Sequence, residues 1–215
     1  MVELKPEPAL CVIGDIVASR RVDDRQWLHR HLEDALAAVN AVVTATEPLA
    51  VTVGDEFQGR YATLGAAIDA CLRIRLLLQP SVDSRFGIGR GEVIPLDPAR
   101  RLQDGPGWWA ARAAITDVAA RSRVGATRLV RTGYRSAAPD PCGPAVSAAL
   151  DCRDHLVGSM PPRSHRLLRG LMIEGRTQAE LADREGISAS AVSQRVRSAG
   201  IGLILEVQQQ LNGLP

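Results

Sequence analysis

The sequence predicts a mixed α/β (α+β) fold: a ferredoxin-like, or palm, βαββαβ domain followed by a small all-α domain. The first observation is that short β-branched runs alternate with stretches of helical periodicity through residue 94. The second is a Pro- and Gly-rich segment at 136–144, after which only short helical patterns follow. We therefore expect a palm domain in residues 1–135, and a linker with a helix-turn-helix domain in residues 136–215.

The first half of the palm domain begins with an apolar run. Residues 9–17 predict a buried strand, and Asp23 and Asp24 can cap a following helix. Apolar residues then recur at helical spacing, namely Leu28, Leu32, Ala35, Val39 and Val43. Pro48 breaks this pattern, so the helix ends before it.

The second half of the palm domain begins with a hairpin. Residues 49–53 and 57–62 predict two strands joined by a turn at 54–56, which places an acidic pair at the hairpin tip. A helix follows and ends before Pro80, with an apolar side made by Leu64, Ile68, Cys71, Leu72 and Leu76. Residues 85–94 complete the pattern as a fourth strand.

Helices dominate the rest of the chain. A Gly-Pro-Gly turn at 105–107 precedes a predicted helix over 108–120, and shorter helices are expected at 145–157 and 163–173. The last helix carries an apolar stripe formed by Ile201, Ile204, Leu205, Val207 and Leu211. This stripe predicts packing against the preceding helices or dimer formation.

Two aspartates carry the strongest chemical signal. Asp15 follows an apolar run and Gly14, and Asp55 follows a β-branched run and Gly54. A carboxylate that ends a buried strand needs a partner, because burying an unpaired charge is costly. Two such carboxylates, joined by one helical segment, predict a divalent cation between adjacent strands and hence phosphate chemistry or nucleotide binding.

Composition narrows the classes of protein. Net charge is +2 over 215 residues, so any nucleic-acid contact must come from a local basic patch. The four cysteines lie far apart without a CxxC pair, which supports neither a zinc site nor a disulfide framework. No apolar stretch approaches about 18 residues and no signal peptide is visible, so we expect a cytoplasmic protein without a membrane partner.

The C-terminal region contains a helix-turn-helix pattern. Thr177 and Glu180 form a capping box, Gly186 allows a sharp turn, and Ser188 caps a second helix. Residues 160–196 resemble region four of sigma factors and related response-regulator tails. That resemblance implies double-stranded DNA as a partner, contacted by Ser190, Ser193, Gln194, Arg195 and Arg197. A helical hairpin used only for packing or dimerisation is the alternative.

The N-terminal motifs resemble those of class III nucleotide cyclases. The segment GDIVAS at 14–19 is similar to their first-strand motif, and TVGD at 52–55 to their second metal motif. The overlapping GDEF at 54–57 also resembles the signature of diguanylate cyclases. FGIGRGEV at 86–93 resembles a later cyclase strand, and the helix around Arg112 resembles the one that stabilises the transition state.

This resemblance implies roles for individual residues. In that family two divalent metals activate the ribose 3′-hydroxyl and neutralise the triphosphate. Mg²⁺ or Mn²⁺ is therefore expected at Asp15 and Asp55, with the backbone carbonyl of Ile16 as a further ligand. Glu56 is either a third ligand or an exposed charge on the turn. Arg112 matches the arginine that stabilises the pentavalent phosphate and is the candidate catalytic residue.

The chain departs from the cyclase pattern at the positions that read the base. Val51 stands where cyclases have a lysine, and Trp108 where they have an asparagine. Val53 replaces the first glycine of GGDEF. The metal-binding half is kept while the base-reading half is missing, which disfavours ordinary cyclase activity.

Three residues directly after the first strand are candidates for nucleotide binding. Ser19, Arg20 and Arg21 could grip a triphosphate, because loops that follow strand ends gather ligand-binding groups. An exposed pair of loop charges is the alternative interpretation.

Over nearly its full length the chain resembles the SatD family. The resemblance rests on GDI at 14–16, GDEFQG at 54–59 and the pattern from Gln178 to Arg195. We predict a homodimeric, DNA-binding transcriptional regulator whose palm domain binds a nucleotide and a divalent metal. One alternative is a metal-dependent nucleotide cyclase or nucleotidyltransferase with altered base selection. Another is a palm fold that serves only as a dimerisation platform, so enzyme activity is left open.

Overall fold

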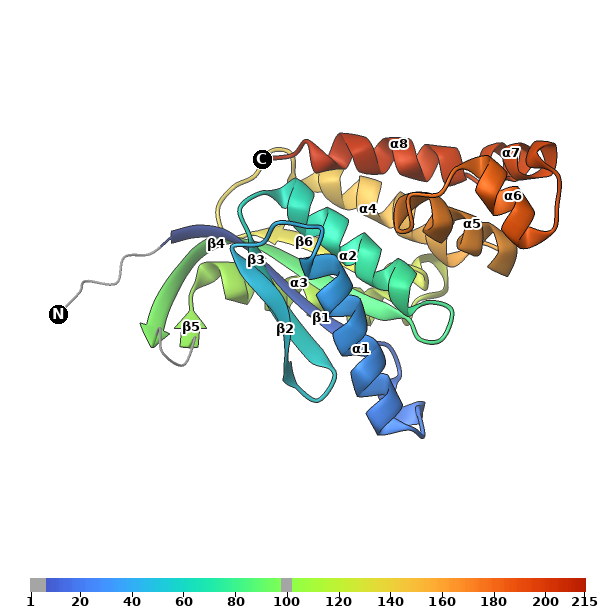
Figure 1. Cartoon of the computed structure of the whole chain (residues 1–215). Helices are drawn as coiled ribbons and strands as arrows, with labels where there is room; N and C mark the ends of the chain where they lie inside the picture. The colour runs from blue at the N-terminus through green and yellow to red at the C-terminus, as the bar shows by residue number, and fades with distance from the viewer. Residues whose placement is uncertain (1–6, 98–101) are drawn as a thin grey trace.

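The computed structural model describes residues 7–97 and 102–215, in which a six-stranded sheet carries helices on both faces and a group of short helices at one end (Figure 1). Its strands are β1 (Glu7–Ile16), β2 (Glu47–Val53), β3 (Glu56–Tyr61), β4 (Ser84–Asp97), β5 (Leu102–Asp104) and β6 (Thr132–Ser136). Its α-helices are α1 (Arg25–Asn40), α2 (Leu64–Leu78), α3 (Pro106–Arg121), α4 (Gly143–Gly158), α5 (Pro162–Met172), α6 (Gln178–Glu185), α7 (Ala189–Ser198) and α8 (Ile201–Asn212). The α+β class and the βαββαβ order are confirmed.

The sheet places β1 at its centre. The strand order is β2-β3-β1-β4 with antiparallel neighbours, and β4 also pairs with β5 and, in parallel, with β6. Because β1 pairs on both sides, its register sets Asp15 opposite Arg85 of β4. Strand β6 has only five residues, which is too short for a clear periodic signal, and the sequence did not predict it.

Helices cover both faces of the sheet. Alternate β1 residues such as Val12 pack against α1 and α2, whereas Cys11 and Ile13 pack against α3 on the other face. Helix α3 lies in direct contact with the backbone of β4, because a Cβ at Gly89 would stand 2.2 Å from the backbone nitrogen of Ala111. The glycines of the FGIGRG segment therefore seat α3 closely on the sheet.

The helices after the 137–142 loop pack on the sheet layer and on one another. Val146 of α4 and Leu211 of α8 join the main core, which includes α1 and α2. A second core forms around Leu167, Leu181 and the other apolar residues of α5–α8, and α2 contributes Leu72 and Leu76 to it. The apolar stripe of α8 thus packs within the chain, since Ile201, Ile204 and Leu211 are all buried.

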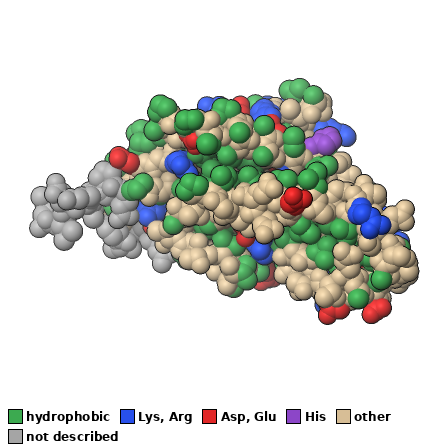
Figure 2. All heavy atoms as spheres, turned by 90° about the horizontal axis from the view of Figure 1, so that it is seen from above, with side chains coloured by type: hydrophobic (Ala, Val, Ile, Leu, Met, Phe, Trp, Pro, Cys, Tyr) green, Lys and Arg blue, Asp and Glu red, His purple; other side chains and the backbone are tan. Residues whose placement is uncertain are grey.

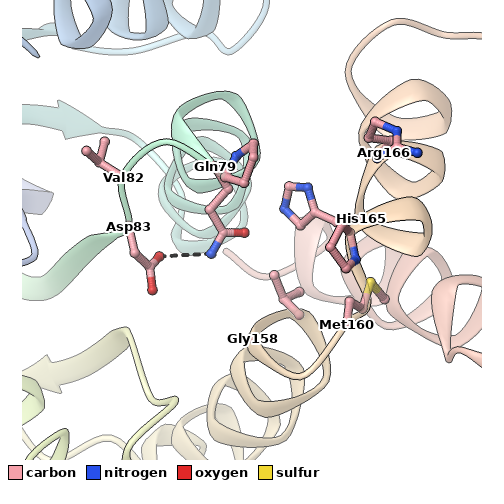
Figure 3. Close-up of a pocket in the computed structure, with 10 residues that line it drawn as sticks. Gln79, Val82, Asp83, Gly158, Met160, His165 and Arg166 are labelled. Atoms are coloured by element: carbon pink, nitrogen blue, oxygen red, sulfur yellow. Dashed lines mark hydrogen bonds between the residues drawn. The ribbon is translucent and has the colours of Figure 1, made fainter.

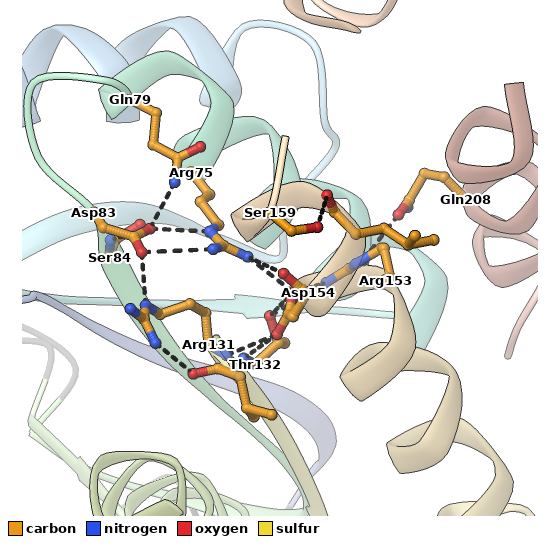
Figure 4. Close-up of polar contacts among 12 residues, drawn as sticks. Arg75, Gln79, Asp83, Ser84, Arg131, Thr132, Arg153, Asp154, Ser159 and Gln208 are labelled. Atoms are coloured by element: carbon orange, nitrogen blue, oxygen red, sulfur yellow. Dashed lines mark hydrogen bonds and ion pairs between the residues drawn. The ribbon is translucent and has the colours of Figure 1, made fainter. Parts of the chain in front are cut away.

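A buried ionic network joins α2, β6, α4 and α8 (Figure 4). Asp154 of α4 is 0% exposed and accepts hydrogen bonds from the backbone nitrogens of Arg131 and Thr132 at 2.8 and 2.6 Å. Its other oxygen lies 3.3 Å from Arg75 of α2, which is 1% exposed. Arg153 next to it donates to Gln208 of α8 at 2.9 Å. These charges lie inside the interface between the sheet layer and the C-terminal helices.

The face seen from above in Figure 2 shows hydrophobic side chains along its middle, and its charged side chains stand apart rather than in one patch. Such a surface agrees with the small net charge of +2. No helix in the described ranges is long and apolar enough to cross a bilayer.

Candidate functional site

The two predicted metal-binding aspartates meet where β1 ends. The hairpin between β2 and β3 turns at Gly54, whose φ of 66° is a left-handed conformation that glycine adopts easily. This turn brings the side chain of Asp55 to β1, where its Oδ2 accepts a hydrogen bond from the backbone nitrogen of Ile16 at 3.2 Å. Asp15 lies immediately before that peptide group, so both carboxylates border the same strand end.

Asp15 is paired with an arginine that the sequence analysis did not single out. Arg85 of β4 donates to both carboxylate oxygens of Asp15, from Nε at 2.8 Å and from Nη2 at 2.9 Å. Both side chains are about three-quarters buried, with exposed fractions of 22% for Arg85 and 28% for Asp15. A bidentate pair of this kind is strong and directional.

The negative charge at this edge is only partly compensated. Burial raises the pKa of Asp15 above its ordinary value, and Arg85 opposes that rise through its hydrogen bonds and charge. The neighbouring carboxylates of Asp55 and Glu56 raise the pKa further. The three carboxylates therefore repel one another in a partly buried place.

Glu56 and Arg112 form a second bidentate pair at the same edge. The Nη1 and Nη2 atoms of Arg112 lie 2.6 and 2.7 Å from the two carboxylate oxygens of Glu56. The hydrogen bonds to Glu56 raise the pKa of Arg112, and the charge of Asp15 acts in the same direction. The candidate catalytic arginine is therefore at the acidic edge, but its contact is to Glu56.

The residues predicted to bind metal and those predicted to bind a nucleotide border the same hollow, which has a volume of about 540 Å³. It is bordered by Asp15, Ile16, Asp55, Glu56 and Arg85, and by the turn η1 (Ser19–Arg21) that follows β1. Within η1, Ser19 is buried while Arg20 and Arg21 are exposed. Ala18 precedes this turn with a φ of 55°, an uncommon conformation for a residue with a side chain, and it fixes the direction in which the turn leaves the strand.

The carboxylates at this edge are suitable ligands for a divalent ion, but Asp15 and Glu56 are already paired with arginines. Among residues 7–97 and 102–215, no three His, Cys, Asp or Glu side chains gather as they would around a metal. Carboxylates are the ligands that Mg²⁺ and Mn²⁺ prefer. Arg85 occupies both oxygens of Asp15, and Arg112 occupies both of Glu56. Each oxygen of Asp15 keeps a second lone pair, so Arg85 does not block a metal ion there, but its positive charge would oppose one.

Helix α7 carries the five predicted DNA contacts. Its N-terminus is capped by Ser188, which accepts from the backbone nitrogen of Ala191 at 3.2 Å, and Gly186 makes the preceding turn with a φ of 63°. Val192 anchors the helix in the second core. Ser190, Gln194 and Arg197 are exposed, whereas Ser193 and Arg195 are half-buried. Arg197 donates to Ser193 at 2.9 Å.

Ion pairs hold the helices beneath α7. Arg166 of α5 makes a bidentate pair with Glu185 of α6, at 2.8 and 2.6 Å. Thr177 and Glu180 form the predicted capping box, with Glu180 accepting from the backbone nitrogen of Thr177 at 2.7 Å. These contacts therefore hold the helices beneath α7 in place.

The sheet, its two helical layers and the acidic strand end define a cyclase-like palm fold. A structure of a bacterial light-regulated adenylyl cyclase aligns with a TM-score of 0.50 and 14% identity, covering 62% of this chain and 44% of that one. The adenylyl cyclase CyaB from P. aeruginosa aligns with a TM-score of 0.42 and 14% identity, covering 52% of this chain and 72% of that one. The aligned part of this chain thus spans less than half of the light-regulated cyclase, and the likeness concerns the fold alone.

The SatD family model matches residues 9–214, and the chain belongs to that family. No curated protein matches the chain significantly. The family match covers the sheet and the C-terminal helices together, as the sequence motifs predicted.

Proposed function

We propose that this chain is a DNA-binding transcriptional regulator whose palm domain binds a nucleotide together with Mg²⁺ or Mn²⁺. The observation that carries the proposal is the hollow of about 540 Å³ beside the end of β1. Both carboxylates and arginines line it, among them Asp15, Asp55, Arg20 and Arg21. Carboxylates favour a metal ion and guanidinium groups favour phosphate oxygens, so a metal–phosphate ligand suits this lining.

The arginines of η1 are placed to meet the phosphates. Arg20 and Arg21 are exposed on the turn that borders the hollow, so they can pair with an incoming anion without first losing a buried partner. A bound divalent ion would supply neutralisation of the phosphate charge. Arg85, once released from Asp15, would face the same anion from β4.

The hollow has little with which to distinguish one base from another. Val53 borders it and is 80% exposed, so it offers an apolar surface without a hydrogen-bonding group. The lysine and asparagine expected from the cyclase resemblance are replaced by Val51 and Trp108. We therefore expect the phosphates, more than the base, to determine affinity.

The α7 helix is the proposed DNA-contacting element. It is short, capped and braced, and the exposed side chains of Ser190, Gln194 and Arg197 are of the types that contact base edges and phosphates. A structural change caused by ligand binding at the palm domain would be transmitted to α7 through α2, whose residues Leu72 and Leu76 pack in the same core as Val192. A homodimer would place two such helices on one DNA site.

Calorimetry with ATP, GTP, CTP and UTP in the presence of Mg²⁺ tests the palm part of this proposal. We expect wild type to bind the four triphosphates with similar affinities. Asp15→Asn and Asp55→Asn should each bind them about tenfold more weakly, which is a loss of about 1.4 kcal/mol in binding free energy. Asp117→Asn, on the exposed surface of α3, is the matched control and should bind like wild type. Failure of wild type to bind any triphosphate would refute nucleotide sensing.

A second candidate is a metal-dependent nucleotide cyclase or nucleotidyltransferase. The observation that favours it is the contact of Arg112 with Glu56, which brings a guanidinium to the acidic edge within one chain. Incubation with each triphosphate and Mn²⁺, followed by mass spectrometry, separates the two candidates. A cyclic or transferred product that disappears in Arg112→Ala and Asp55→Asn would favour the enzyme.

A further inference from the structure

A separate cavity lies between the sheet layer and the C-terminal helices. It has a volume of about 260 Å³ and is enclosed by the C-terminal ends of α2 and α4 and by the start of α5 (Figure 3). Apolar groups make much of its wall, among them Val82, Val157 and Met160. It lies apart from the acidic strand end, because none of its lining residues borders the other hollow.

Two residues that line this cavity each carry a buried polar atom without a hydrogen-bond partner within the described part of the chain. These atoms are Oε1 of Gln79 and Nε2 of His165. His165 is 8% exposed, and Figure 3 shows its ring directed from α5 toward Gln79. Leaving a buried polar group unpaired costs about 1–3 kcal/mol, so a cavity with two of them favours an occupant that supplies partners.

The orientation of Gln79 is fixed by its other contact. Its Nε2 donates to Oδ1 of Asp83 at 3.1 Å, and a carboxylate can only accept. Asp83 is ionised: burial raises its pKa, but Arg75 and Arg131 outweigh that effect and the pKa lies below its ordinary value. The amide oxygen of Gln79 is therefore an acceptor left free for a donor.

The surrounding charges favour an uncharged occupant. Asp83 is matched by Arg75 and Arg131, at 2.9 and 2.6 Å, so it offers little to a cation. Arg166 also borders the cavity, but it already pairs with both carboxylate oxygens of Glu185, and an anion would face the Asp83 carboxylate and the Gln79 oxygen. Burial, together with the charges of Arg75 and Arg169, lowers the pKa of His165, so this ring is neutral near pH 7.

We propose that this cavity is a binding site for a small uncharged ring compound that bears an amide or amino group. The ring would lie against the apolar wall, the N–H group would donate to Gln79, and a second polar atom would pair with Nε2 of His165. A volume of about 260 Å³ is slightly below the range typical of drug-sized ligands, which favours a compact occupant. Because α2 and α4 form one side and α5 the other, such a ligand would bridge the sheet layer and the helices that support α7.

Benzamide is a suitable probe, with benzoate as its charged counterpart. Titration followed by protein NMR should show saturable one-to-one binding of benzamide to wild type and at least tenfold weaker binding of benzoate. Gln79→Leu and His165→Leu should each weaken benzamide binding at least tenfold. Gln210→Leu and His29→Leu, which make the same replacements on exposed helix positions, should bind like wild type.

Several results would overturn the proposal. If benzamide does not bind wild type up to its solubility limit, the cavity is not a site for this class of compound. Equal affinity of wild type and Gln79→Leu would place the probe elsewhere. Tighter binding of benzoate than of benzamide would refute the uncharged class. Should His165→Leu fail to fold, Gln79→Leu with its matched control decides the question, because Gln79 is only partly buried.

Discussion

The carboxylate of Asp15 and the guanidinium of Arg85 face each other across β1 and β4 and share two hydrogen bonds, of 2.8 and 2.9 Å. The protein thus supplies its own cation to a residue predicted to bind metal. If a divalent ion binds there, as proposed above, the positive charge of Arg85 opposes it.

Arg85→Ala should therefore bind Mn²⁺ more tightly than wild type, by about tenfold or 1.4 kcal/mol. The reason is that Asp15, Asp55 and Glu56 would be left without that compensating charge. Electron paramagnetic resonance titration of free Mn²⁺ measures the affinity. Arg135→Ala, on an exposed position of β6, is the control. Unchanged Mn²⁺ affinity in Arg85→Ala would remove Asp15 from the metal ligands.

Asp154→Ala should destabilise the fold by about 3–5 kcal/mol, because it removes the carboxylate paired with buried Arg153 and leaves buried Arg75 with Asp83 alone. Asp151→Ala, three residues earlier on α4, breaks a half-exposed pair with Arg121 and should cost about 0–1 kcal/mol. Urea unfolding followed by circular dichroism compares the two. Similar losses in both variants would show that the buried network contributes no more than a surface pair.

Stability should depend on the protonation of His165. Its pKa lies below the ordinary value of 6.5 in the folded state, because of burial and the nearby charges of Arg75 and Arg169. The unfolded chain then takes up a proton more readily, so this contribution is present above pH 6.5 and is lost as the pH falls through the folded pKa. Urea unfolding from pH 7.5 downward should show a smaller decline for His165→Leu than for wild type. His29→Leu is the control and should lose stability with falling pH as wild type does. If His165→Leu also lost stability as steeply as wild type, His165 would not be the group responsible.

Arg197→Ala should weaken binding to duplex DNA and lower the slope of log affinity against log salt by about 1, the amount expected for one phosphate contact. Fluorescence anisotropy with a random-sequence duplex at several salt concentrations measures both quantities. Arg123→Ala, an exposed arginine after α3, serves as the control. An unaltered slope in Arg197→Ala would show that α7 is not the phosphate-contacting helix.

Local signals predicted much of the fold. The periodicity of α2, that of α1 through Val39 and the cap of α1 are confirmed, with Asp24 accepting from the backbone nitrogen of Trp27 at 2.8 Å, whereas Val43 lies beyond the end of α1 at Asn40. The hairpin tip at Gly54 and the capping box at Thr177 also formed as expected. Each of these depends on residues close together in the chain, so a single sequence contains the information.

The parts that could not be predicted depend on long-range register. Arg85 meets Asp15 only because β1 and β4 pair in one particular alignment, 70 residues apart. Arg75 and Arg153 lie on helices whose patterns give no sign that charged side chains are fully buried. Glu56 was weighed as a metal ligand or an exposed charge, whereas the structure pairs it with Arg112 of α3. Whether it also meets a metal stays a prediction.

Helix α2 has a consequence for how the chain loses its structure. Its residues Ile68 and Ile74 belong to the main core, while Leu72 and Leu76 belong to the second. If either core unfolds, α2 loses the packing on one of its sides. Calorimetry should therefore record a single cooperative unfolding transition. A protease cut in the 137–142 loop should then leave two fragments that remain associated, since both contribute residues to each core.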